Sequence, residues 1–172
     1  MKIAFNPSYD EGYYINLSEN GKALLGTKFI GTMGLLDHLS LHNGLSGIFA
    51  SDGERASAYL SHVRQSIEGS MVEASFKNDA LGVTKCLLQW RDALIMSGWA
   101  PSQDGGNSTP KLQLLSKIEN SWSAHLKGSA DRWLELAKLS KKQPLLEEGD
   151  TIECSCSKNA LPRLVQDVLV SC

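Results

Sequence analysis

Apolar residues along the chain alternate between short strand-like runs and longer stretches with helical spacing. Residues 2–7 form an apolar run that ends at a proline, which predicts an opening strand. A second strand is expected at 13–17, before the turn sequence Asn20-Gly21. Alternating apolar residues predict further strands at 70–76 and 151–156.

The longer stretches carry apolar residues at three- and four-residue steps, which indicates helices. Ser51 and Glu54 form a capping-box pattern at the start of one helix, and Asn78 or Asp79 is expected to cap another. A polar segment, 100–110, is expected to be a surface loop. The predicted helices cover 28–43, 51–69, 78–97, about 112–122, a segment from 129, and a segment from 162.

Strands that are separated by helices favour an α/β fold with a small, largely parallel sheet flanked by helices. The sequence has no internal repeat, so we expect a single α/β domain over residues 1–172. Hydrophobic residues make up 42% of the chain, which is enough for a substantial core.

Charge and cysteine content narrow the functional classes. The formal net charge is −2, so the chain has no general basic footprint for nucleic acid. No apolar run suits a signal peptide or a membrane span, and we therefore expect a cytoplasmic protein that makes no membrane contact. The cysteines are expected to be reduced thiols: Cys86, Cys154, Cys156 and Cys172.

The sequence around Lys22 superficially matches a phosphate-binding loop. That motif needs a glycine five residues before its Gly-Lys pair and a Ser or Thr after the lysine. Asn16 and Ala23 occupy those positions. A solvated turn is the better interpretation, and no nucleotide cofactor is expected.

His38 and His42 have the i, i+4 spacing of a zinc pair on a helix. A metalloprotease would need a glutamate at the position of Leu39, and no third ligand is evident. Cys154 and Cys156, one residue apart on a predicted strand, are interpreted as two small core side chains. We therefore assign no metal ligand.

Asp150 and Glu153 resemble the paired carboxylates of a metal-dependent nuclease. The lysine of that signature is replaced by Ser155, and the two acids lie too close in sequence for neighbouring strands. We assign no catalytic residue. Three tryptophans fall on apolar helical faces and are expected in the core, namely Trp90, Trp122 and Trp133.

Several segments together resemble one protein family. They are Gly34-Leu35-Leu36-Asp37-His38-Leu39 with Gly44-Leu45, Glu54-Arg55-Ala56, Ser75-Phe76-Lys77-Asn78-Asp79, Leu87 to Leu94, Gly98-Trp99, and Leu161-Pro162. In this order they are similar to the amino-terminal region of AddB-type helicase–nuclease subunits, which are PD-(D/E)XK nuclease family proteins.

The resemblance implies an inactive, helicase-like motor domain without a phosphate loop. Members of the family are much longer, carry the nuclease signature near the far end, and process double-stranded DNA ends for recombinational repair. This chain would then be a non-catalytic amino-terminal fragment with a structural role. Its partners would be the rest of the parent polypeptide and a helicase partner subunit.

DNA contact is left open by the sequence, with Arg55, Arg64 and Lys85 as candidates on exposed helix faces. The alternative function is a stand-alone protein-interaction module unrelated to DNA. A third hypothesis, a metal-dependent enzyme that uses His38 and His42, has the least support from the sequence.

Overall fold

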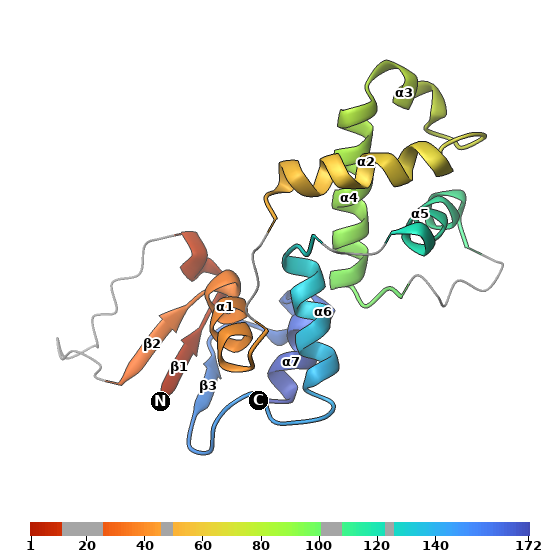
Figure 1. Ribbon diagram of the computed structural model, residues 1–172. Coiled ribbons are helices and arrows are strands. Elements are labelled where there is room, and N and C mark those ends of the chain that lie inside the picture. The colour runs from red at the N-terminus through yellow and green to blue at the C-terminus, as the bar shows by residue number, and fades with distance from the viewer. Residues whose placement is uncertain (12–25, 46–49, 101–107, 123–125) are drawn as a thin grey trace. The chain divides into compact units, whose positions relative to one another are not determined.

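The computed structural model describes residues 1–11, 26–45, 50–100, 108–122 and 126–172. The predicted strand at 13–17, the Asn20-Gly21-Lys22 turn and loop residues 101–107 lie outside this described part. The chain packs into two compact units (Figure 1). We call Met1–Gly47 with Arg132–Cys172 the sheet unit, and Ile48–Asp131 the helical unit.

Among the described residues, the sheet unit contains three parallel strands in the order β2-β1-β3. They are β1 (Lys2–Phe5), β2 (Thr27–Ile30) and β3 (Thr151–Cys154), and Figure 1 shows them side by side. Phe5 aligns with Ile30 on one side and with Cys154 on the other. The prediction of an α/β fold with a small parallel sheet is therefore confirmed.

The segment 28–43 begins differently from the prediction. Thr27–Ile30 forms β2, and helix α1 (Thr32–His42) starts only after Gly31. Gly31 has extended backbone angles, which separates the two elements. A strand of four residues is too short to reveal its alternation next to a long helix.

Helices α1, α6 (Ser129–Leu139) and α7 (Arg163–Val170) complete the sheet unit, although α6 belongs to the helical unit up to Asp131. Two 3₁₀ turns, Pro7–Glu11 and Lys158–Ala160, also belong to it. Its most buried side chains come from β1, α1, α6, α7 and the segment before β3: Ile3, Phe5, Leu35, Leu36, Leu39, Trp133, Leu136, Leu145, Val165 and Val168.

The helical unit consists of α2 (Asp52–Ser66), α3 (Glu73–Asn78), α4 (Ala80–Met96) and α5 (Pro110–Ser121). The capping box that starts α2 is present, because Ser51 and Glu54 each accept the other's backbone N–H. Apolar residues of α2, α4 and α5, with Ile67 directly after α2, form its core: Ala56, Tyr59, Val63, Ile67, Leu87, Leu88, Leu114, Leu115 and Ile118.

The predicted strand at 70–76 is wrong. The chain turns at Gly69, whose φ of +71° suits glycine, and Glu73 then begins α3. The Glu73 carboxylate accepts a hydrogen bond from the Gly69 N–H at 2.8 Å. Val72 and Phe76 both pack against the helical core, and their separation of four residues suits a helix as well as a strand.

The tryptophans divide between full and partial burial. Trp133 is fully buried, whereas Trp90 and Trp122 are only partly covered by the helical core. Trp99 follows Gly98 at the end of α4 and packs against the same core. Within the described chain, no helix combines the length and apolar character needed to cross a bilayer.

Candidate functional site

The carboxyl edge of the sheet is the first place to look for a ligand site. The chain leaves β1 to form β2 on one side and later β3 on the other, so the strand order reverses at β1. Open α/β sheets bind ligands beside the carboxyl ends of strands at such a reversal. Asn6, Gly31 and Ser155 follow the three strands at this edge.

A carboxylate of the chain itself occupies the helix terminus at this edge. Both oxygens of Asp10 accept the Met33 backbone N–H, at 3.0 and 3.2 Å, in the first turn of α1. A Cβ atom on Gly31 would lie 2.2 Å from Asp10 Oδ1, which shows how closely the two segments approach. Helix amino termini favour anions, and phosphate groups often bind there. Here Asp10 supplies the negative charge.

Hydrogen bonds also satisfy the polar groups that follow β1 and β3. The Ser155 N–H donates to the Phe5 carbonyl at 3.0 Å, and the Ser155 hydroxyl donates to the same oxygen at 3.2 Å. Asn6 Nδ2 donates to Ser155 Oγ at 3.1 Å. Ser155, which occupies the lysine position of the nuclease signature, therefore joins β3 to β1 through hydrogen bonds.

Cys154 and Cys156 lie together at the same edge. Their Sγ atoms are 3.3 Å apart, and both side chains are half-buried rather than enclosed in the core. Burial, together with neighbouring Cys154, raises the pKa of the Cys156 thiol. The sequence correctly indicates that the two cysteines share a face but does not reveal this close approach.

The carboxylates of the rejected nuclease pattern form ion pairs with the start of the chain. Asp150 contacts the amino terminus of Met1, and this hydrogen bond lowers the pKa of the Asp150 carboxyl group. Glu153 Oε2 lies 2.7 Å from Lys2 Nζ. The two acids thus have separate partners.

His38 and His42 stack on α1, with ring centroids 6.3 Å apart. Burial lowers the pKa of His38, and the charges of Lys28 and His42 act in the same direction. His42 Nε2 lies 3.8 Å from Glu147 Oε1. Across the part of the chain that the structure describes, no three or more His, Cys, Asp or Glu side chains are grouped to hold a metal ion.

The helical unit contains a buried cluster of charged residues, formed by Arg55, Arg91, Asp92, Glu119 and Asp131. We call it the arginine–carboxylate cluster. Arg55 holds Asp92 with two hydrogen bonds, at 2.8 and 2.9 Å. Such bidentate pairs are among the strongest protein hydrogen bonds. They join α2 to α4.

Arg91 is the centre of this cluster, and its side chain is only 4% exposed. Its three guanidinium nitrogens donate to three different carboxylates: Asp92 at 2.8 Å, Glu119 at 3.0 Å and Asp131 at 2.6 Å. Burial opposes its charge, but Asp131 and Glu119 raise the pKa of Arg91, so it stays protonated. Arg91 thereby connects α4, α5 and the first turn of α6.

Tyr59 adds a neutral donor to the arginine–carboxylate cluster. Its hydroxyl donates to Glu119 Oε1 at 3.1 Å. Burial and the Glu119 carboxylate raise the pKa of Tyr59, which keeps the phenol protonated. Burial also raises the pKa of Glu119, against the opposing effect of Arg91.

The structure corrects one DNA-contact candidate. Arg55 is 5% exposed and its Nη atoms hold Asp92, so it does not present its charge to solvent. Arg64 and Lys85 are exposed, as expected.

In the sheet unit, Asp37 pairs with Arg132 at 2.7 Å. The sequence offers no local sign of these pairings, because the partners lie far apart along the chain.

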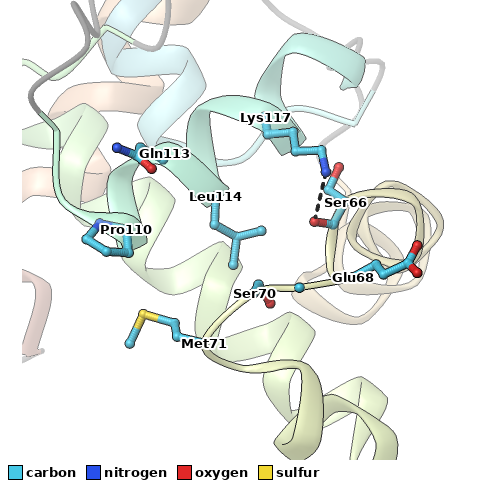
Figure 2. Close-up of a pocket in the computed structure, with 9 residues that line it drawn as sticks. Ser66, Glu68, Ser70, Met71, Pro110, Gln113, Leu114 and Lys117 are labelled. Carbon is cyan, nitrogen blue, oxygen red and sulfur yellow. Dashed lines mark hydrogen bonds between the residues drawn. The ribbon is translucent and has the colours of Figure 1, made fainter.

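Pockets in the helical unit are further candidate ligand sites. One, of about 220 Å³, lies between the end of α2 and α5 (Figure 2). Lys117 lines it, but its ammonium is directed to the Ser66 carbonyl at 3.4 Å, where it caps the end of α2. A pocket of about 490 Å³ adjoins the Arg55–Asp92 pair, with Lys85 and Gln89 in its lining.

Comparison with known proteins identifies no relative: no protein-family model, curated protein or solved structure matches this chain significantly.

Proposed function

We propose that this chain is a non-catalytic, architectural domain of a helicase–nuclease that processes DNA ends. One observation carries the proposal: the charged residues of the resembling segments are used to hold the protein together. Asp37 pairs with Arg132, while Arg55, Arg91 and Asp92 belong to the arginine–carboxylate cluster.

An arginine that acts on a nucleotide or on DNA needs free N–H donors that reach the phosphate. All three guanidinium nitrogens of Arg91 instead bind carboxylates of this chain. Removing one member of such a buried set leaves another charge without compensation. The cluster therefore suits a role in maintaining the helical unit.

The carboxyl edge of the sheet supports the same proposal. A nucleotide-binding motor would place phosphate groups against backbone N–H groups at a strand-to-helix turn. At the β2-to-α1 turn, the Asp10 carboxylate accepts a hydrogen bond from the Met33 N–H. A phosphate at this turn would have to displace a negatively charged group that is already hydrogen-bonded.

The DNA part of the proposal depends on the family resemblance. We infer that the partners are the rest of a parent polypeptide and a helicase subunit, in the cytoplasm. Lys85 and Arg64 are the exposed cations that remain as candidates for DNA phosphate contact. Contacts of this kind would weaken as the salt concentration rises.

Two assays on the purified chain test the absence of catalysis. End-labelled linear duplex DNA is incubated with Mg²⁺, and ATP hydrolysis is followed with and without DNA. We expect no activity above the buffer control in either assay. Magnesium-dependent cleavage that co-purifies with the chain, and is lost in the Asp150→Asn/Glu153→Gln variant, would overturn the proposal.

A positive test concerns the gene and the partner. We expect the reading frame to continue past codon 172 and to encode a nuclease signature near its far end. The separately expressed remainder of that protein should co-elute with this chain during gel filtration. A stop codon after Cys172, with no co-elution with a helicase subunit, would instead favour a stand-alone interaction module.

A further inference from the structure

We propose that Cys154 and Cys156 form a reversible dithiol–disulfide site that exchanges with low-molecular-weight disulfides such as glutathione disulfide. The two Sγ atoms are 3.3 Å apart at the carboxyl end of β3. A disulfide bond is about 2.05 Å long, so the sulfurs need to approach by only about 1.3 Å. This site is independent of the proposed function.

The backbone between the cysteines is fixed in place. Ser155 donates two hydrogen bonds to the Phe5 carbonyl, one from its N–H and one from its hydroxyl. Asn6 also donates to the Ser155 hydroxyl. Since Ser155 is fastened to β1, ring closure requires movement of the two side chains more than of the strand.

Both thiols are half-buried, so neither is sealed in the core. Burial and Cys154 together raise the pKa of Cys156, which keeps its proton to higher pH. Because the thiolate is the attacking species in exchange, one cysteine of the pair attacks first and the other then acts as the resolving thiol.

The reaction has two steps and needs no other oxidant. The thiolate of one cysteine attacks one sulfur of glutathione disulfide, breaks its S–S bond and releases one glutathione thiolate. The second cysteine loses its proton to solvent and attacks the cysteine sulfur of this mixed disulfide, which forms the Cys154–Cys156 bond and releases the second glutathione thiolate. The two protein thiols lose two electrons, and glutathione disulfide gains them.

The test isolates the pair within the full chain. The Cys86→Ser/Cys172→Ser variant retains only Cys154 and Cys156, and the Cys154→Ser/Cys156→Ser variant is its matched control. Each is equilibrated with mixtures of reduced and oxidised glutathione, and then analysed by intact mass and by alkylation of free thiols. The pair-only variant should lose two hydrogen atoms, and its doubly alkylated fraction should fall at least about tenfold under oxidising mixtures.

Excess reduced glutathione should restore both thiols, and the matched control should show no loss of two hydrogens. Adding Cys156→Ser to the pair-only variant should stop the reaction at the mixed disulfide on Cys154. The proposal is overturned if the pair-only chain keeps both thiols, accumulates stable glutathione adducts, or joins a second chain through these cysteines.

Discussion

The two units of this molecule place their charged groups differently. In the sheet unit, Lys2 and Glu153 form an ion pair with both side chains more than half exposed, and the buried Arg132 pairs with Asp37, whose side chain is 64% exposed. In the helical unit, Arg91 and Glu119 form one with both side chains less than a tenth exposed. Exposed pairs contribute about 0–1 kcal/mol, whereas breaking a buried pair costs about 3–5 kcal/mol. The helical unit should therefore depend on its charges far more than the sheet unit does.

The largest expected effect comes from Arg91→Met. This variant keeps an apolar side chain of similar length but leaves Glu119 and Asp131 without their shared cation. We expect a loss of about 3–5 kcal/mol in the free energy of unfolding, measured by urea denaturation.

Arg64→Met is the matched control for that experiment, because Arg64 is exposed on α2. It should change the free energy of unfolding by no more than about 0.5 kcal/mol. Equal effects at the two arginines would contradict the assignment of a special role to the arginine–carboxylate cluster.

A pair of glycine substitutions sharpens the comparison between the units. In Gly31→Ala, the new Cβ would lie 2.2 Å from Asp10 Oδ1 and 2.5 Å from the Asp10 backbone nitrogen. The backbone must shift to relieve this overlap, so we expect destabilisation of about 1–3 kcal/mol.

Gly53→Ala should have the opposite sign. Gly53 lies in the first turn of α2, and the nearest atom to its added Cβ is 3.9 Å away. Replacing glycine in a helix should stabilise the protein by up to about 1 kcal/mol. Denaturation curves of both variants would detect the difference, and stabilisation by Gly31→Ala would show that Asp10 does not approach α1 as described.

Asp10→Ala tests the contact at the start of α1 directly. It removes the acceptor of the Met33 N–H, and losses of helix caps typically cost about 1 kcal/mol. The neighbouring Glu11→Ala variant serves as the control. Equal unfolding temperatures for the two variants would contradict a stabilising contact between Asp10 and the start of α1.

The smallest expected effect is the acid response of Glu54. Hydrogen bonds from Ser51 lower the pKa of Glu54 from 4.5, so the folded protein binds this proton more weakly than the unfolded chain. The contribution of ionised Glu54 to the free energy of unfolding is therefore present above about pH 4.5. It is lost as the pH falls through the lower pKa of the folded state. Glu54→Gln should flatten this part of the stability–pH curve, and an unchanged curve would contradict the assignment.

Local signals in the sequence predicted the local features of the fold. The capping box at Ser51 and the Asp79 cap of α4 are both present. Both could be predicted because each cap's partner lies only three residues away in the sequence. Strand β2 was missed because it directly precedes α1, whose helical spacing dominates that stretch. Helix α3 was missed because the apolar residues Val72 and Phe76, four positions apart, suit a strand as well as a helix.

The candidate sites could not be predicted in the same way. Asp10 contacts Met33 across 23 residues, and Arg91 contacts Asp131 across 40. No local pattern marks either pairing, since each depends on how separate elements pack. The sequence identified Arg91 and Asp92 as members of a resembling segment, but only the packing shows that Arg91 binds the carboxylates of Glu119 and Asp131 and that Asp92 binds Arg55.

The Asp10 carboxylate occupies the amino terminus of α1, and we propose that no nucleotide binds there. Thermal unfolding of the chain in increasing Mg·ATP tests it most directly, because a ligand that binds the folded state raises the midpoint. We predict an unchanged midpoint up to millimolar Mg·ATP. A saturable rise that Gly31→Ala abolishes would contradict the account.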